Sequence, residues 1–224
     1  VILTASGGPF LNKSLKNIRN ISPNKALNHP TWKMGKKISI DSATLMNKIF
    51  EIIEAKKIFN IELNKIKILI HPKSYIHAIV KFKNGLIKIV AHDTNMKIPI
   101  FNSIYFRDNK YIKTNKIDLK ILNNLQFSEV SSKMFPLIKI LNKIPKSETL
   151  FETLLVSIND ELVSLFLKNK ISFDNIPIVL NKLLNSKTFS KFKLKKVDNL
   201  AQIESLNRFA RLKTNSLSVI SSSK

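Results

Sequence analysis

The alternation of apolar and polar residues predicts β-strands in the first part of the chain. Asn84 and Gly85 form the strongest short-range signal for a β-hairpin, and apolar runs lie on both sides of them. The opening run starts on Val1, and we interpret it as a buried strand whose upstream pairing partner is missing, in a chain that is a fragment or the product of an unusual start. In all, the pattern predicts strands at 1–4, 66–70, 78–82 and 86–91.

Apolar residues at helical spacing predict helices in the rest of the chain. Leu45 and Ile49 belong to such a pattern, which indicates a helix from Ser42 to Phe59 with Ser42 as its N-cap. A short extended piece is expected just before it, at 37–40. Beyond residue 132 the apolar positions predict helices at 134–144, 149–169, 176–184 and 203–217.

These elements predict an α+β protein with a separate helical part. We expect a first domain with a mostly antiparallel sheet over residues 1–105, and a connector of weak periodicity over 106–131. A small α-helical bundle domain is expected over 132–224, because the predicted helix at 149–169 carries the broad apolar face that a bundle buries.

The charge of the chain changes the range of possible functions. The 224 residues include 38 lysines and arginines against 15 aspartates and glutamates, a formal net charge of +23. Such a charge is typical of nucleic-acid-binding proteins. The lysines are scattered, however, and the compact cluster at 191–196 has no array of aromatic residues for base stacking. A basic nucleic-acid-binding module is therefore the weaker alternative, and we expect the charge to favour anionic substrates.

The composition also bears on the compartment. The chain contains no cysteine, which excludes disulfides and thiolate metal sites. It has no run of about 18 apolar residues that could cross a membrane, and its opening lacks the basic segment of a signal peptide. We expect a cytoplasmic protein without membrane contacts.

Candidate chemistry is concentrated in the first 51 residues. Ser6 is followed by Gly7 and Gly8 at the end of the first predicted strand. Two glycines allow the backbone to approach a ligand closely, and the adjacent hydroxyl can donate to a phosphate oxygen. A plain glycine turn is the competing interpretation.

A second cluster combines His29, Trp32 and Met34 in a segment that ends at Gly35. The only tryptophan of the chain lies here, between a proline and a glycine. Such a loop suits a lid that covers a small substrate and excludes water. The alternative is a surface loop whose tryptophan packs on the edge of the core.

A third cluster lies on the helix predicted from Ser42. Asn47 and Glu51 are four residues apart and share a helix face with Lys48 close by, so an amide, an ammonium and a carboxylate could hold a phosphate, a hydroxyl and a divalent cation. A helix N-terminus at Ser42 would favour the same anion. The alternative is a solvated helix face with a Lys48–Glu51 ion pair, which contributes only about 0.2–0.5 kcal/mol.

The order and spacing of these clusters resemble the 1-deoxy-D-xylulose 5-phosphate (DXP) reductoisomerase family. The matching runs are Ser-Gly-Gly-Pro-Phe at 6–10, His-Pro-x-Trp-x-Met-Gly at 29–35, and Lys-Ile-Ser-x-Asp-Ser-Ala-Thr-x-Met-Asn-Lys-x-x-Glu at 37–51. His-Pro-Lys-Ser at 71–74 is similar to the family's His-Pro-Gln-Ser, and Met96 and Pro99 fit a Met-x-x-Pro element. Weaker likeness continues through Asn159 to Arg211, so the resemblance covers nearly the whole chain.

The resemblance implies an enzyme of non-mevalonate isoprenoid-precursor biosynthesis. Members of the family rearrange a phosphorylated ketose with the help of Mn²⁺ or Mg²⁺ and reduce the resulting aldehyde with NADPH. The product is 2-C-methyl-D-erythritol 4-phosphate. The resemblance also implies a homodimer.

Matching positions imply roles for individual residues. Glu51 is the implied metal ligand, and with His29 it also contacts the substrate and takes part in catalysis. Gly35 is implied near the nicotinamide nucleotide, and Trp32 and Met34 belong to the lid. The substrate phosphate and neighbouring oxygens would be held by Ser6, Ser42, Asn47 and Lys48.

Departures from the family pattern limit these expectations. The family's NADPH-binding domain and its other acidic metal ligands lie upstream of Val1, so we expect the chain alone to be inactive. Ile49 replaces a glycine and is expected to reduce the room at the site, and the altered segment 90–95 puts the dimer contact in doubt. The alternatives are a non-catalytic remnant of the same fold and the nucleic-acid-binding module.

Overall fold

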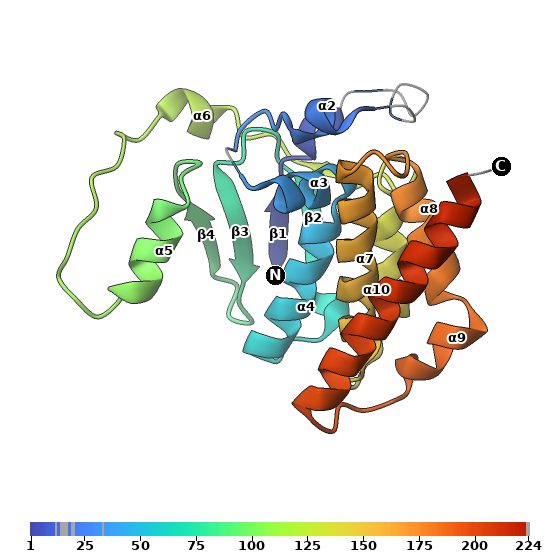
Figure 1. The fold of residues 1–224 in the computed structure, drawn as a ribbon. Helices are drawn as coiled ribbons and strands as arrows, with labels where there is room; N and C mark the ends of the chain where they lie inside the picture. Colours follow the sequence, from blue (N-terminus) through green and yellow to red (C-terminus); the bar gives the residue numbers. More distant parts are fainter. Residues whose placement is uncertain (12, 14–17, 19–20, 33, 223–224) are drawn as a thin grey trace.

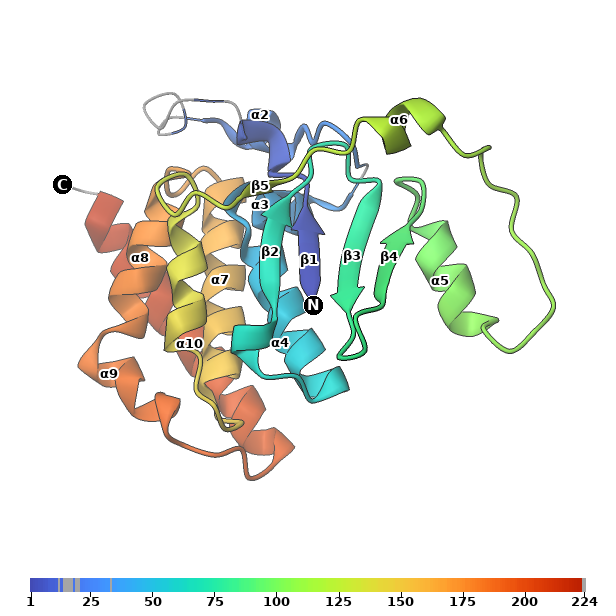
Figure 2. The same ribbon diagram turned by 180° about the vertical axis from the view of Figure 1, so that it is seen from behind.

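The chain folds around a five-stranded sheet with the order β4-β3-β1-β2-β5 (Figures 1 and 2). The computed structural model describes residues 1–11, 13, 18, 21–32 and 34–222, the last five of these by their helical backbone only. β1 is parallel to β2, and the remaining pairs are antiparallel. The expected mostly antiparallel sheet is therefore confirmed. The strands are β1 (Ile2–Ala5), β2 (Lys67–Ile70), β3 (Ile76–Lys81), β4 (Ile87–Ala91) and β5 (Ser128–Glu129).

β1 is the central strand of the sheet. Ile2 pairs with Lys67 of β2 on one side and with Ile79 of β3 on the other. The expectation that the pairing partner of this strand is missing is therefore wrong, since both neighbours are present in the described residues. β1, β2 and β4 run in one direction, and β3 runs in the opposite direction. The C-terminal ends of β1, β2 and β4 and the start of β3 therefore lie at the same edge of the sheet.

The predicted hairpin is confirmed. Phe82 donates its N–H to the carbonyl of Leu86 at 2.8 Å, and Gly85 adopts a φ of 89°, which glycine tolerates without steric cost. β5 lies within the predicted connector, together with the short helix α6 (Leu119–Asn123), and was not predicted. Two residues are too short for a periodic pattern.

The region predicted as one helix from Ser42 is two helices. α3 (Lys36–Thr44) and α4 (Met46–Phe59) meet at Leu45, whose φ is 60°. The predicted extended piece at 37–40 is therefore wrong, and Ser42 lies in the last turn of α3 instead of capping a helix. The second half of α3, residues 39–44, is buried without interruption, with Ile40 and Ala43 packed in the core, so tertiary packing and not a local apolar pattern accompanies this helix.

The long helices of the C-terminal part agree with the prediction. α7 (Phe151–Leu167), α8 (Asn175–Leu184) and α10 (Leu200–Ser222) correspond to the patterns at 149–169, 176–184 and 203–217. The predicted helix at 134–144 is the 3₁₀ helix η3 (Pro136–Lys143). The remaining elements are η1 (Gly8–Phe10), α2 (Pro23–Leu27), η2 (Leu63–Lys65), α5 (Lys97–Ile104), α9 (Lys187–Ser190) and η4 (Lys191–Lys193).

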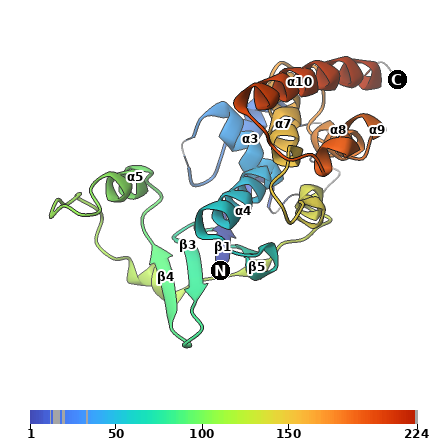
Figure 3. The ribbon, with the colours of Figure 1, turned by 90° about the horizontal axis from the view of Figure 1, so that it is seen from below.

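One hydrophobic cluster connects the helices of both parts. Ile40 of α3 and Ile49 of α4 belong to the same buried cluster as Leu154 and Ile158 of α7. The helices therefore form one body beside the sheet, while α5 and the segment after it extend to the other side (Figure 3). The domain boundaries at 105 and 132 stay a prediction. Among the described residues, no helix has both the length and the apolar character needed to cross a membrane.

Candidate active site

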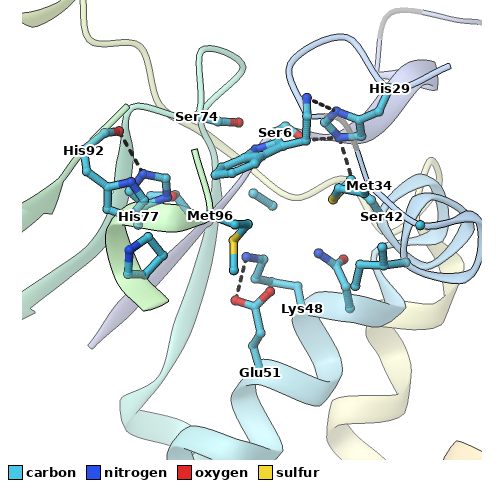
Figure 4. A pocket seen from close by; sticks show the side chains of 17 residues that line it. Ser6, His29, Met34, Ser42, Lys48, Glu51, Ser74, His77, His92 and Met96 are labelled. Atoms are coloured by element: carbon cyan, nitrogen blue, oxygen red, sulfur yellow. Dashed lines mark hydrogen bonds and ion pairs between the residues drawn. The ribbon is translucent and has the colours of Figure 1, made fainter. Parts of the chain in front are cut away.

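A cavity of about 560 Å³ lies between the sheet edge where β1 ends and the helices α3 and α4 (Figure 4). Lys48 and Glu51 extend from α4 toward its centre, with His29 and Ser42 on one side and His77 and His92 on the other. All the candidates named from the sequence line this cavity, namely Ser6, His29, Trp32, Met34, Gly35, Ser42, Asn47, Lys48 and Glu51.

His29 connects two hydroxyl-bearing segments of the cavity wall. Its Nε2 lies 3.1 Å from Ser6 Oγ and 3.1 Å from Ser42 Oγ. Its Nδ1 accepts the backbone N–H groups of Thr31 at 3.2 Å and Trp32 at 3.0 Å, so the imidazole is neutral and carries its proton on Nε2. Burial lowers the pKa of His29, which agrees with this tautomer. The imidazole therefore presents a donor to the cavity.

The glycine turn after β1 allows close packing of α3. Gly8 has a φ of 65°, and a Cβ atom on it would lie 2.9 Å from the carbonyl oxygen of Ser42 and 3.0 Å from Cα of Ala43. A side chain at Gly8 would therefore push the end of α3 away from the turn. Close contact at this point keeps the hydroxyls of Ser6 and Ser42 within reach of one imidazole nitrogen.

The break at Leu45 directs the start of α4 to the cavity. Lys48 is only 8% exposed, and its Nζ lies 2.7 Å from Oε2 of Glu51. The ion pair of the competing interpretation is thus present, but it lines a cavity and does not lie on a solvated helix face. Asn47 Oδ1 is buried and has no hydrogen-bond partner among the described residues, so it is available to a ligand.

Ile49, which replaces a glycine of the family pattern, points away from the site. It is fully buried in the cluster shared with α7, and it does not line the cavity. The expected loss of room is therefore not observed. Gly35 lines the cavity, and apart from its two chain neighbours no described residue has an atom within 4 Å of the place where its Cβ would be.

His77 and His92 line the cavity and were not chosen as candidates from the sequence. Their rings stack with centroids 3.7 Å apart, and His77 Nε2 donates to the carbonyl of His92 at 3.1 Å. Trp32 approaches the His77 ring edge-on at 6.0 Å. Burial lowers the pKa of His77 to about 4, the hydrogen bond to the His92 carbonyl acts in the opposite direction, and the nearby His92 and Lys48 side chains lower the pKa a little further.

Ser74 also lines the cavity and was not chosen as a candidate from the sequence. Ser74 is buried, and its hydroxyl has no hydrogen-bond partner among the described residues. Its φ of 51° is unusual for a residue other than glycine. The signals available in the sequence were the His-Pro-Lys-Ser run at 71–74 and the alternation of β3, and neither identifies which side chains reach the cavity.

The low pKa of His77 predicts a pH-dependent contribution to stability. A folded-state pKa of about 4, against an ordinary value of 6.5, means that folding favours the neutral ring. This stability is present above pH 6.5 and is lost as the pH falls toward 4. The melting temperature of the wild type should therefore fall more steeply over this range than that of His77→Gln, whose amide can still donate a hydrogen bond. Parallel curves for the two proteins would show that His77 does not titrate in this way.

The described residues that line the cavity do not complete a divalent-metal site. Glu51 is the only acidic residue among the described ones that line the cavity. No group of three or more His, Cys, Asp or Glu side chains suited to a metal occurs in the described part of the chain. Mg²⁺ and Mn²⁺ are bound by several oxygen donors, so Glu51 can supply only one of them.

Sequence models of a known family match most of the chain. A model described as the DXP reductoisomerase C-terminal domain matches residues 93–213, and one described as the 1-deoxy-D-xylulose 5-phosphate reductoisomerase C-terminal domain matches residues 1–59. The chain belongs to the DXP reductoisomerase family. The family resemblance inferred from the motifs is thereby confirmed.

Individual members of the family are similar along almost the whole chain. A 1-deoxy-D-xylulose 5-phosphate reductoisomerase of Pelagibacter ubique is 58% identical over 98% of this chain and 56% of the relative. The enzyme of the same name from Persephonella marina is 44% identical over 85% of this chain and 51% of the relative. The chain thus spans about half the length of the curated relatives that it matches.

Solved structures of the family share the fold. A crystal structure of DOX-P reductoisomerase in complex with NADPH, fosmidomycin and magnesium superposes with a TM-score of 0.87 at 32% identity, covering 97% of this chain and 54% of the other. The Zymomonas mobilis enzyme in complex with NADPH gives a TM-score of 0.84 at 31% identity, covering 97% and 55%.

Proposed function

We propose that this chain is the substrate-binding and C-terminal part of a DXP reductoisomerase. The whole enzyme would isomerise and reduce 1-deoxy-D-xylulose 5-phosphate to 2-C-methyl-D-erythritol 4-phosphate with NADPH and a divalent metal ion. One observation carries the proposal: in a chain of this family, the hydroxyls, amide, imidazole and ammonium of the family's motifs line a single cavity.

The chemistry of the cavity suits a phosphate monoester. Ser6 and Ser42 supply hydroxyl donors, His29 supplies Nε2–H, and Lys48 supplies a buried ammonium group. Charge-assisted hydrogen bonds from such groups are stronger than neutral ones. The net charge of +23 adds a field that attracts the dianion to the cavity. We assign the phosphate to these residues, with the amide of Asn47 on its neighbouring oxygens.

The loop from His29 to Gly35 is proposed as the lid. Trp32 and Met34 lie on the cavity wall, and Met96 and Pro99 line the same cavity from the region of α5. Closing apolar side chains over the substrate would exclude water from a reactive aldehyde. Gly35 would lie near the nicotinamide, where the absence of a side chain leaves space for the ring.

Glu51 is proposed as one ligand of the catalytic divalent metal. The donor set of the described residues does not complete such a site, so the other carboxylates would come from the region that the family carries upstream of the matched part. When bound, the metal supplies Lewis-acid polarisation of the ketone. Before the metal ion and the substrate bind, Lys48 would orient the Glu51 carboxylate through their 2.7 Å ion pair.

The enzyme is proposed to be a cytoplasmic homodimer that includes an NADPH-binding half, on the same or a separate chain. β4 supports the dimer, because every residue of this edge strand is exposed although Ile87, Ile89 and Val90 are apolar. Contiguous exposed apolar residues on an edge strand are characteristic of protein interfaces. Ile100 and Ile104 of α5 are exposed as well, and α5 lies beyond β4 at the same end of the sheet order (Figures 1 and 2).

The activity can be tested with a chimeric enzyme. A polypeptide of these 224 residues alone should not oxidise NADPH in the presence of DXP, because most metal ligands and the nucleotide site of the family are not among its described residues. Fused to the N-terminal half of the Pelagibacter ubique relative, it should form 2-C-methyl-D-erythritol 4-phosphate at a rate that depends on DXP and metal. Activity of the isolated polypeptide would refute the first expectation. A folded, NADPH-binding chimera without product would refute the proposed function.

A further inference from the structure

Asp41 is a buried carboxylate that does not line the cavity. Its side chain is 1% exposed. Oδ1 accepts a 2.8 Å hydrogen bond from Nδ2 of Asn159 on α7, and Oδ2 lies 2.7 Å from Nζ of Lys37, one turn earlier on α3. The carboxylate thus lies between its own helix and the C-terminal part of the chain, with a partner on each.

Further charged residues extend this contact to α10. Lys37 Nζ also lies 3.0 Å from Asp160 Oδ1, and Arg211 of α10 donates to Asp160 Oδ2 at 2.8 Å. We call Lys37, Asp41, Asn159, Asp160 and Arg211 the Asp41 cluster. It is a continuous chain of ion pairs and hydrogen bonds that connects α3 with α7 and α10.

The cluster lies next to a cavity residue. Asp41 and Ser42 are consecutive on α3, so their side chains point about 100° apart around the helix axis. Asp41 is directed to α7, while Ser42 reaches His29 in the cavity. Gly8 packs against the carbonyl of Ser42 from the turn after β1. Rotation of α3 about its axis would therefore break the Asp41 contacts at the same time as it moved the Ser42 hydroxyl.

The buried charge of Asp41 is not expected to contribute much to the free energy of unfolding. Burial raises the pKa of the Asp41 carboxyl, with Lys37 and Asn159 acting in the opposite direction, so the desolvation cost offsets part of what these partners contribute to stability. Buried ion pairs often contribute no more to stability than apolar residues of similar size. They do, however, fix one geometry, because their hydrogen bonds are directional.

We propose that Asp41 is a positioning residue that, through Asn159 and Lys37, fixes the rotation of α3 and thereby the direction of the Ser42 hydroxyl in the cavity. The C-terminal helices α7 and α10 then act on substrate binding without contacting the substrate. This inference rests on the proposed function, because Ser42 is there assigned to the substrate phosphate.

The substitution Asp41→Asn in the chimeric enzyme tests the inference. It preserves the shape of the side chain and removes the charge that Lys37 and Asn159 hold. We expect the KM for DXP to rise about tenfold to a hundredfold, since displacement of a site group by about 1 Å can cost that much. The KM for NADPH and the melting temperature should stay near the wild-type values. A purely structural role would instead lower the amount of active enzyme, and with it the apparent kcat, at an unchanged KM.

Asn159→Ser is the second variant, and it removes only the link to α7. It should raise the KM for DXP in the same direction. The matched control is Glu152→Gln, since Glu152 is a buried carboxylate that, like Asp41, has a lysine partner, but it connects α7 with Lys57 of α4, at 3.2 Å, and not with α3.

The outcomes separate this inference from the proposed function. A wild-type chimera without DXP-dependent NADPH oxidation would overturn the proposed function. An active wild type with an unchanged KM for DXP in both folded variants, Asp41→Asn and Asn159→Ser, would overturn the positioning role alone. If Asp41→Asn does not fold, the KM of Asn159→Ser decides. An equal rise in Glu152→Gln would also overturn it, because loss of a buried carboxylate that does not contact α3 would then have the same effect.

Discussion

Replacement of Glu51 by glutamine should reduce the turnover of the assembled enzyme by orders of magnitude while leaving the fold intact. The change keeps the shape of the side chain and removes a negative oxygen donor, which weakens the binding of a hard divalent cation. Its ion pair with Lys48 contributes little to stability, because the Glu51 side chain is 42% exposed and solvent screens its charge. We therefore expect a nearly unchanged melting temperature and a higher Mn²⁺ requirement.

The comparison to make is activity against Mn²⁺ concentration for the wild type and the variant. Glu54→Gln is the matched control, since Glu54 is an exposed carboxylate of the same helix that does not line the cavity. Its curve should coincide with that of the wild type. If the curve of Glu51→Gln also coincides, Glu51 is not a metal ligand.

Lys48→Ala should have the second-largest effect, mainly on substrate binding. Lys48 lines the cavity, and its ammonium is assigned to the substrate phosphate. Loss of a charged hydrogen bond costs about 1.5–3 kcal/mol, so kcat/KM for DXP should fall roughly 10- to 150-fold, with a clear rise in KM. Steady-state kinetics at constant ionic strength measures both parameters.

Lys36→Ala is the control for the general positive field. Lys36 is the exposed first residue of α3 and carries the same charge as Lys48 without lining the cavity. Its kinetic parameters should stay near those of the wild type. Equal losses in the two variants would mean that the lysines act as a diffuse field, and the assignment of Lys48 to the phosphate would be wrong.

Local patterns were sufficient to predict much of the fold. The hairpin around Gly85 and the helix α7 follow from alternation and helical spacing within short windows, and their partners in space do not alter them. The break between α3 and α4 could not be predicted in this way. Leu45 has a positive φ, and leucine carries none of the signals by which glycine or asparagine marks such a conformation.

The residues that line the cavity could be predicted from the order of the motifs, but not from the chemistry of single residues. The Gly7–Gly8 turn and the helix with Lys48 and Glu51 each had an ordinary structural interpretation of equal or greater weight. The order of the three clusters in the sequence was what placed their residues in one site, and the structure brings them together.

Contacts between segments far apart in the chain could not be predicted from the sequence. Asp41 and Asn159 are 118 positions apart, and no spacing rule connects them. His77 and His92 meet because antiparallel pairing of β3 and β4 brings the start of one strand beside the end of the other. Such residues become visible only when the register of the sheet and the packing of the helices are known.

The proposed function is tested most directly by whether the cavity recognises the phosphate of DXP. Isothermal titration of the chimeric enzyme with DXP and with unphosphorylated 1-deoxy-D-xylulose compares the two ligands at constant ionic strength. We expect the wild type to bind DXP much more tightly than the unphosphorylated sugar, and Lys48→Ala to lose a large part of this preference. Equal affinities of the wild type for both ligands would contradict the proposed function.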